Sequence, residues 1–259
     1  MKIENTKDLK QVSLVIPVKL GDINHMNELL ADKKIGLFYQ IIVVISGVSS
    51  CREYSVRAQL ARCGYNIRVV IQQAVLDPGS ARNLGIKLVE TRYCALLDVR
   101  TRPNDAWFGH LYEFMLNGQY DLSIGSVSYL TVGLFAKSFL LATYGFNPIA
   151  CLPGSILSIE AFSAVGHFLP FMAGEDSEWL SRVKFLNLSI YPRDPQSVVF
   201  YKINNDRGFF YFVSKWFKNY RISFKLPAYQ VQKYLYVLFL SFPIIAAAYS
   251  RAISTASSA

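Results

Sequence analysis

Two side chains that suit the binding of an anion, Arg82 and Asn83, stand just after a Pro-Gly-Ser turn at residues 78–80. A helical pattern follows the turn, so both residues are expected in the first turns of a helix that runs to about Val89. Free backbone N–H groups at a helix start attract negative charge, and arginine suits a phosphate or a base edge. We expect an anion-binding site here, and the alternative is an exposed helix arginine.

Adjacent carboxylates, Glu175 and Asp176, follow Gly174 and precede another helical pattern. A carboxylate in this place can cap the helix, or it can accept a proton as a general base. A further acid, Asp98, ends the apolar run at 95–97 and is separated by one residue from Arg100. These acids are the candidate catalytic and ligand-binding groups of the chain.

Alternating strand and helix patterns position these residues. Apolar runs rich in β-branched residues predict buried strands, and the mixed stretches between them predict helices. The predicted strands cover 12–18, 40–45, 67–71, 93–97 and 121–128, with a strand and short helix over 153–166, and the predicted helices cover 22–38, 51–63, 78–89, 103–116 and 175–184. This alternation implies an α/β fold with a Rossmann-like, mostly parallel central sheet flanked by helices.

The ends of the predicted strands define a candidate ligand crevice. In a doubly wound sheet the ligand lies beyond the carboxyl ends of the strands. Pro17, Ser46, the turn at 77–83 and Asp98 all fall at or just after such ends. We therefore expect them to meet at one site, the alternative being ordinary loop residues.

Four short stretches in a fixed order carry a family resemblance. They are 12–18 (Val-Ser-Leu-Val-Ile-Pro-Val), 79–86 (Gly-Ser-Ala-Arg-Asn-Leu-Gly-Ile), 95–100 (Ala-Leu-Leu-Asp-Val-Arg) and 174–179 (Gly-Glu-Asp-Ser-Glu-Trp). In this order and at these separations the chain resembles the family 2 glycosyltransferases of the GT-A fold over about residues 11–185. The resemblance implies an inverting enzyme that moves a sugar from a nucleotide donor to an acceptor hydroxyl.

The resemblance also implies roles for individual residues. Asp176 takes the position of the general base, because a sugar hydroxyl is a poor nucleophile until a carboxylate accepts its proton. Glu175 and Trp179 are placed beside the acceptor, with core packing as the alternative for Trp179. The residues implied to bind the nucleotide sugar are Pro17, Val18, Ser46, Arg82, Asn83, Asp98 and Arg100.

Two positions depart from the family's pattern. The family has an Asp-x-Asp motif whose acids hold the ribose and a divalent metal, whereas this chain reads Asp98-Val99-Arg100. Asp98 is left as the implied ligand for Mg²⁺ or Mn²⁺, and a lone carboxylate is a weak site unless donor phosphates complete it. Arg100 can instead set a fixed cation against the diphosphate. Ser46 stands where the family commonly has an acid near the base or ribose, so the donor base stays open.

The C-terminal part differs from the rest of the chain in charge. Residues 201–259 hold eight lysines and arginines against one acid, within a net charge of +9 for the whole chain. Basic and aromatic residues interleave over 207–226. Residues 234–250 carry no charge and would span roughly 26 Å as a helix, slightly less than a bilayer core.

These features predict a GT-A domain over residues 1–200 and a C-terminal helical, membrane-associating segment over 201–259, at the cytoplasmic face of a membrane. A helix packed on the catalytic domain is the alternative. Nucleic acid is the weaker interpretation, since no nucleic-acid-binding motif accompanies the basic residues.

The cysteines and the N-terminus indicate a reducing compartment. Cys51, Cys63, Cys94 and Cys151 include no C-x-x-C pair, and three histidines offer no zinc cluster. We expect reduced cysteines that pack as small hydrophobes. Residues 1–10 are polar and charged and contain no apolar stretch of signal-peptide type, so we expect no secretion.

Together these observations predict an inverting, hexosyltransferase-type glycosyltransferase that acts on a glycan or lipid-linked acceptor in cell-surface polysaccharide synthesis. A non-catalytic GT-A-like protein that binds a nucleotide sugar or glycan is one alternative, favoured by the altered motif at 98–100. A sugar nucleotidyltransferase is the other. Its glycine-rich, lysine-bearing phosphate loop is poorly matched by Val18-Lys19-Leu20-Gly21.

Overall fold

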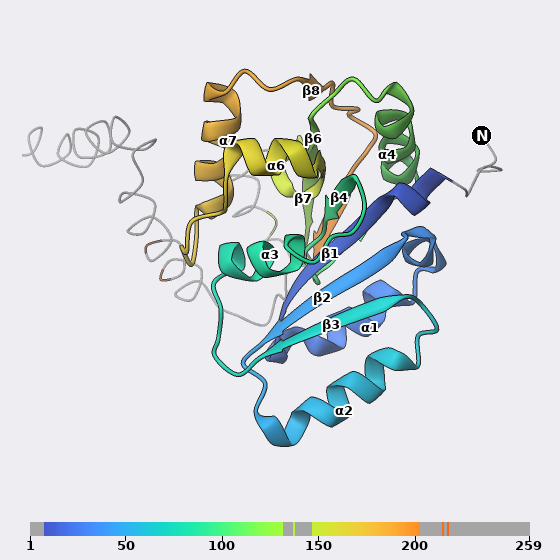
Figure 1. Cartoon of the computed structure of the whole chain (residues 1–259), viewed down its shortest axis with the longest axis vertical. Helices are drawn as coiled ribbons and strands as arrows, with labels where there is room; N and C mark the ends of the chain where they lie inside the picture. The colour runs from blue at the N-terminus through green and yellow to red at the C-terminus, as the bar shows by residue number, and fades with distance from the viewer. Residues whose placement is uncertain (1–7, 132–136, 138–146, 203–213, 215–216, 218–259) are drawn as a thin grey trace, which may run out of the picture.

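The computed structural model describes residues 8–131, 137, 147–202, 214 and 217, and its first half contains a parallel sheet (Figure 1). The strands run in the order β3-β2-β1-β4. Every residue of β2 is buried, as is most of β1. A parallel sheet covered on both faces needs continuous apolar strands, which is the pattern that the sequence shows. The bounds are β1 (Val12–Lys19), β2 (Gln40–Ser46), β3 (Ile67–Gln72) and β4 (Tyr93–Leu96).

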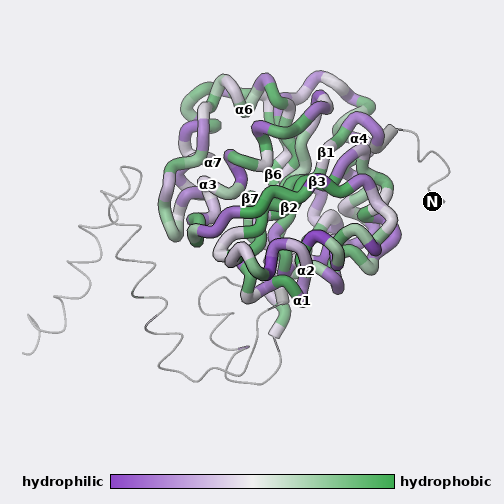
Figure 2. Tube along the Cα trace, turned by 60° about the horizontal axis from the view of Figure 1, so that its bottom comes forward, coloured by the Kyte–Doolittle hydropathy of each residue, from purple (hydrophilic) through white to green (hydrophobic). Residues whose placement is uncertain are grey.

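Helices cover both faces of this sheet and divide the apolar core into two clusters. α1 (Ile23–Leu30), α2 (Ser50–Ala61) and α4 (Asp105–Asn117) pack on one face around Leu14 and Val43. α3 (Pro78–Ile86), α6 (Ile159–Val165) and α7 (Glu175–Phe185) pack on the other around Val15 and Val44. Neighbouring residues of one strand serve opposite clusters because side chains alternate across a sheet. Figure 2 shows the hydrophobic strands running through the middle of the described part.

The second half of the sheet is mixed: five of the eight strand pairings in the described sheet are parallel, as a mostly parallel sheet requires, but β5 and β7 run antiparallel to their neighbours. Within the described residues nine strands form one sheet, in the order β3-β2-β1-β4-β7-β6-β9-β5 with β8 paired to β6. β7 is antiparallel to both β4 and β6, and β5 is antiparallel to β9. The prediction rested on the strand–helix alternation of the first hundred residues, which does not continue. The bounds are β5 (Thr101–Pro103), β6 (Leu122–Leu130), β7 (Ile149–Ser158), β8 (Ile190–Tyr191) and β9 (Val199–Lys202).

Side-chain caps define where α3 and α4 begin. Asp77 caps α3 by accepting from Ser80 N at 2.8 Å, and Asn104 caps α4 by accepting from Trp107 N at 2.9 Å. These caps leave fewer free N–H groups at each helix start. α3 ends at Ile86 rather than at about residue 89.

The helix predicted over residues 22–38 is instead three short elements. They are η2 (Leu20–Asp22), α1 and η3 (Lys33–Leu37). The Asp32 side chain accepts from Lys34 N at 3.0 Å, which begins a new turn rather than continuing α1. A further 3₁₀ turn, η1 (Asp8–Gln11), precedes β1.

The predicted C-terminal segment, including 207–226 and 234–250, lies outside the described residues except for Ser214 and Phe217. β9 crosses the boundary predicted at residue 200, so the sheet extends at least to Lys202. In the described part of the chain, no helix has both the length and the apolar character needed to cross a bilayer. Membrane association therefore stays a prediction.

The close packing of α3 on β1 depends on Gly85. A Cβ atom at this position would lie 2.4 Å from Val15 Cγ1 and 3.3 Å from Val44 Cγ2. We expect Gly85→Ala to lower the free energy of unfolding by about 1–3 kcal/mol, since an added methyl group overpacks a filled core. Gly109→Ala on α4 is the matched control, because nothing lies within 4 Å of its Cβ position. Urea denaturation that finds the two variants equally stable would contradict this packing.

Candidate active site

A cavity of about 550 Å³ opens at the carboxyl ends of β1, β2 and β4. Most of the predicted site residues line it, as expected for the ligand crevice of an α/β sheet. The second half of the fold contributes residues from β6, β7, β9 and the start of α7. The predicted residues among its described lining are Pro17, Val18, Ser46, Arg82, Asp98, Arg100, Glu175 and Asp176.

Arg82 is buried on α3, with only 4% of its surface exposed. Its Nη1 donates to Glu175 Oε1 at 2.8 Å, and its Nη2 donates to Asp98 Oδ1 at 2.9 Å. The guanidinium therefore bridges the end of β4 and the start of α7. Arg82 lines the cavity with both ends of its guanidinium held by carboxylates, and direct binding of the nucleotide by Arg82 stays a prediction.

The electrostatics of this bridge keep the arginine charged. Burial by itself lowers the pKa of Arg82, but the carboxylates of Asp98 and Glu175 outweigh it and raise the pKa. For Glu175, burial raises the pKa, and the charge of Asp176 adds to that rise while Arg82 opposes it. Arg82 is thus the counter-ion that allows Glu175 to be buried in its charged form.

Asp176 is the second residue of α7 and lines the cavity. Its Oδ1 accepts from Ser177 N at 2.8 Å, and Cys151 Sγ lies 3.5 Å from its Oδ2. The N-cap position of α7 is Gly174, so Asp176 lies inside the first turn and engages one free N–H group there without capping the helix. Asp176 takes part in no salt bridge among the described residues, whereas Asp98 and Glu175 each pair with Arg82.

Cys151 on β7 is a neighbour of Asp176 that the sequence did not single out. Burial raises the pKa of its thiol well above the ordinary value, and the charges of Asp176 and Asp98 add to the effect. The thiol therefore stays protonated and can donate its weak hydrogen bond to Asp176. It supports the orientation of the carboxylate without competing for a proton.

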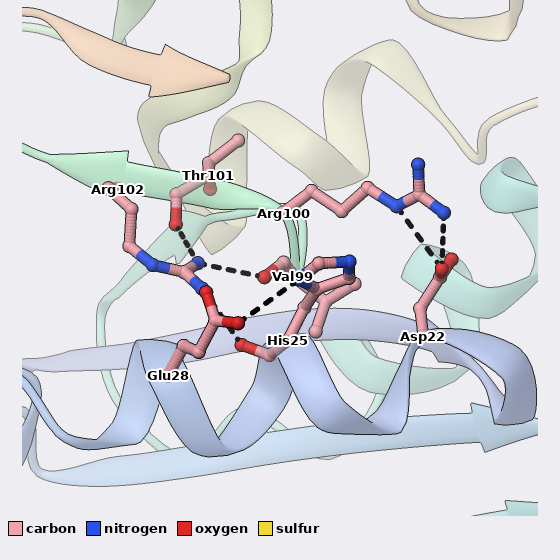
Figure 3. A network of polar contacts seen from close by, with 7 residues as sticks. All are labelled: Asp22, His25, Glu28, Val99, Arg100, Thr101 and Arg102. Carbon is pink, nitrogen blue, oxygen red and sulfur yellow. Dashed lines mark hydrogen bonds and ion pairs between the residues drawn. The ribbon is translucent and has the colours of Figure 1, made fainter. Parts of the chain in front are cut away.

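Arg100 pairs with Asp22 rather than with Asp98 (Figure 3). Its Nε lies 3.1 Å from Asp22 Oδ1. Two residues later Arg102 donates to Glu28 Oε2 at 2.8 Å and to the His25 carbonyl at 3.1 Å. Both arginines thereby attach the chain after β4 to η2 and α1. Asp98 is held instead by Arg82 Nη2 at 2.9 Å.

The donor set of the site does not fit a divalent cation held by the protein alone. Among the described residues no group of three or more His, Cys, Asp or Glu side chains is placed to hold a metal ion. Asp98 and Asp22 each already pair with an arginine. A positively charged guanidinium beside each acid repels a divalent ion.

Two predicted site residues are placed elsewhere. Asn83 does not appear among the cavity's lining residues: its Nδ2 donates to the Phe168 carbonyl at 2.8 Å and its Oδ1 accepts from Phe168 N at 2.9 Å. Trp179 is fully buried, packs on Phe168 with ring centroids 5.0 Å apart, and donates Nε1–H to the Gly166 carbonyl at 2.9 Å. Both residues hold the segment between α6 and α7. The core alternative for Trp179 is correct, and stacking on an acceptor is not available to it.

Several lining residues were missed from the sequence. Asp22, Tyr129, Cys151 and Tyr201 all reach the cavity. Tyr201 had been assigned to the C-terminal segment, and β6 and β7 had been given no site residues. Each of these residues lies at or near the end of a strand or helix, and that position is a signal from which the sequence could have predicted them. The strand pairing that brings them to the cavity, however, is not visible in the local sequence pattern.

Comparisons with known proteins agree with this architecture. The sequence model of glycosyl transferase family 2 matches residues 26–149, just under half of the chain. A solved structure of S. aureus TarS residues 1–349 in complex with UDP-GlcNAc is similar with a TM-score of 0.56 and 14% identity, covering 76% of this chain and 60% of that one. The same TarS fragment in complex with UDP gives a TM-score of 0.53 and 14% identity, with 75% and 61% covered.

A longer structure of S. aureus TarS is similar with a TM-score of 0.53 at 14% identity, covering 74% of this chain. This chain spans only 37% of that longer structure. At such identity the likeness shows a shared GT-A-like fold. No curated protein matches this chain in sequence.

The buried bridge makes a prediction about stability. Arg82→Met should lower the free energy of unfolding by about 3–5 kcal/mol near neutral pH, because it leaves two carboxylates without their counter-ion. Arg57→Met is the matched control, since it breaks an exposed pair with Glu53 and should cost at most about 1 kcal/mol.

The sign of the pH dependence follows from the raised pKa of Glu175. A carboxyl group with a raised pKa in the folded state binds more protons when folded, so its contribution to stability falls as pH rises through that pKa. Loss of Arg82 raises this pKa further. The deficit of Arg82→Met relative to the native protein should therefore shrink between pH 7 and pH 5, and urea denaturation that shows a constant deficit would contradict the assignment.

Proposed function

We propose that this chain is an inverting family 2 glycosyltransferase that uses a nucleoside diphosphate sugar. The observation that carries the proposal is the convergence of Asp98, Arg82 and the Glu175–Asp176 pair on one cavity at the strand ends. The family 2 match over 26–149 and the fold shared with TarS, which binds UDP-GlcNAc in its solved complex, support it. A uridine nucleotide is accordingly the first donor to test.

The proposed reaction is a single displacement at the anomeric carbon. An acceptor hydroxyl forms the new glycosidic bond while the bond to the diphosphate oxygen breaks, and attack from the opposite face inverts the centre. The hydroxyl proton goes to Asp176, and the nucleoside diphosphate leaves with the electron pair. Asp176 suits this role because its carboxylate has no ion pair among the described residues and lines the cavity.

Arg82 acts through its partners rather than on the substrate. By holding Asp98 and Glu175 at 2.9 and 2.8 Å, it sets the start of α7 relative to the end of β4. The general base on α7 is thereby kept at a constant distance from the donor half of the site. Such positioning matters because a small misplacement of a reacting group costs much of the rate.

Arg100 and Lys19 are proposed to stabilise the charge that develops on the diphosphate. Both line the cavity beside Asp98 and Asp22. A fixed cation needs little reorganisation as the leaving group departs, which is the property of an effective electrostatic catalyst. In this proposal Arg100 leaves Asp22 in part for the phosphate oxygens, and no step passes through a metal ion.

The acceptor is proposed to be a growing glycan or a lipid-linked sugar of a cell-surface polysaccharide, handled at the cytoplasmic face of a membrane. The basic and apolar composition of residues 201–259 supports this placement. A non-catalytic GT-A-like protein remains the alternative, favoured by the altered motif Asp98-Val99-Arg100. A measurement of turnover distinguishes the glycosyltransferase from the non-catalytic protein.

The general base is tested by Asp176→Asn in a nucleotide-release screen over purified UDP-, GDP- and dTDP-sugars. Turnover should fall by roughly 10²–10⁴-fold, the usual contribution of general base catalysis, while donor affinity changes little. Asp105→Asn is the matched control, because Asp105 also stands in the first turn of a helix but is exposed and remote from the cavity. Near-native turnover of Asp176→Asn would overturn the assignment, and no release by the native protein with any donor would favour the non-catalytic alternative.

Exhaustive chelation tests the proposal that Arg100 takes the place of a divalent metal ion. The native protein should keep most of its turnover, Arg100→Met should lose turnover with and without metal, and Arg100→Asp should gain a Mn²⁺ requirement because it adds a carboxylate near Asp22 and Asp98. Native activity that vanishes on chelation and returns with Mn²⁺ would show that Arg100 does not replace a metal.

Membrane association is tested by sedimentation with anionic vesicles. The full chain should sediment with phosphatidylglycerol vesicles more than with neutral phosphatidylcholine ones, and added salt should weaken binding. A chain shortened to residues 1–206, which keeps β9, should stay in solution. Equal sedimentation of both chains would count against the C-terminal segment as the membrane-binding part.

A further inference from the structure

Two tyrosines on neighbouring strands line the cavity and take no part in the mechanism proposed above. Tyr129 on β6 and Tyr201 on β9 are direct partners in the parallel register of these strands. Their ring centroids are 5.6 Å apart and their planes are inclined by 54°. The sequence had offered Trp179 as the aromatic group of the site, and the fold supplies this pair instead.

These rings differ in exposure from the aromatic pair that joins β4 to α4. The pair Tyr93 and Phe114 lies in the core, with only 1% of each residue exposed. Tyr129 and Tyr201 are instead partly exposed and border open space in the cavity. An aromatic side chain presents an apolar face and, in tyrosine, a polar tip, so such a pair can cover a ligand that is apolar on one face and polar at its edges.

Tyr201 also stands between the two halves of the site. Its phenol is close enough to feel the charges of Asp98, Arg100 and Asp22, on the side assigned to the diphosphate, and Tyr201 lines the cavity together with Cys151. Cys151 in turn contacts Asp176 at 3.5 Å. Burial, followed by the charge of Asp98, raises the pKa of Tyr201, so the phenol keeps its proton and can donate a hydrogen bond.

We propose that the Tyr129–Tyr201 pair is the wall against which the sugar ring of the donor lies. The inference rests on the proposed function, because it takes the diphosphate to lie near Arg100 and the general base to be Asp176. Both tyrosines line the same cavity as Arg100 and Asp176, so a sugar attached to that diphosphate and open to attack near Asp176 can lie against them. Its C–H face can pack on the aromatic faces, and the Tyr201 hydroxyl can bind one of its hydroxyl groups.

The proposal separates binding of the sugar from binding of the nucleotide. A nucleoside diphosphate without sugar reaches Arg100 and the strand ends but leaves the tyrosine wall uncovered. Replacing a ring should therefore weaken the nucleotide sugar selectively. A purely structural role for the pair would weaken both ligands alike, since β6 and β9 form part of the cavity as a whole.

Calorimetry tests this with UDP-, GDP- and dTDP-hexoses, each measured beside its own nucleoside diphosphate. We expect Tyr129→Ala and Tyr201→Leu each to weaken the nucleotide sugar by about fivefold, the scale of one aromatic face contact, and to leave the diphosphate within about twofold of native. Tyr129→Phe should keep native affinity for both ligands. Tyr54→Ala is the control for loss of a tyrosine, since Tyr54 on α2 is 84% exposed and should change neither affinity.

The outcomes distinguish this inference from the proposed function. Suppose that the native protein binds both ligands. If the Tyr129→Ala and Tyr201→Leu variants then bind the nucleotide sugar as well as the native protein does, or lose affinity for both ligands to the same extent, the tyrosine wall is overturned and the proposed function stands. If the native protein binds no member of the panel, both are overturned. Selective loss of the nucleotide sugar in both variants, with Tyr129→Phe unchanged, supports the wall.

Discussion

The guanidinium of Arg82 is the contact on which the arrangement of the site depends. It is buried between two elements that are remote in the chain, the end of β4 and the start of α7, and pairs with an acid from each. A buried charge without partners is costly, so neither acid can leave without a large loss of stability. The arrangement thus couples stability to function, because the element held by Glu175 also carries Asp176.

The mixed sheet explains why the cavity has two chemically different sides. Its parallel half, β3-β2-β1-β4, brings strand ends and the start of α3 to one edge, where anions are favoured. β7 then reverses direction beside β4 and contributes Cys151 and Pro153 to the same opening. The second half of the sheet supplies the tyrosines from the parallel pair β6 and β9, and α7 supplies the carboxylate without an ion pair. In a fully parallel sheet, no strand would run antiparallel to β4 and contribute residues to this opening as β7 does.

Charge is distributed unevenly within the cavity lining. Arg82 compensates Asp98 and Glu175, Arg100 compensates Asp22, and Asp77 is occupied in capping α3. Asp176 is left to a backbone N–H and a thiol. A carboxylate that is not engaged by an arginine can accept a hydrogen bond from a substrate hydroxyl, as a general base must. The ion pairs of the neighbouring acids thereby make Asp176 distinct from them.

The sequence alone determined the order of strands and helices in the first half, because buried parallel strands and capped helices are written in local patterns of apolar and turn residues. It also placed eight of the ten predicted site residues at the cavity, since strand ends of a parallel sheet meet at one edge. Only the tertiary structure decided their partners. Arg82 reaches Glu175 across 93 positions and Arg100 reaches Asp22 across 78, and no local period specifies such contacts.

The same reason accounts for Trp179, Asn83, Tyr129 and Tyr201. An aromatic or amide residue near a site motif has the same local pattern whether it faces the ligand or the core. The packing of α7 on α6 turned Trp179 inward, and the pairing of β6 with β9 turned two tyrosines toward the cavity. Long-range packing decides which side of an element faces a ligand, because the neighbours of a side chain in space determine whether it is buried in the core or lines the cavity.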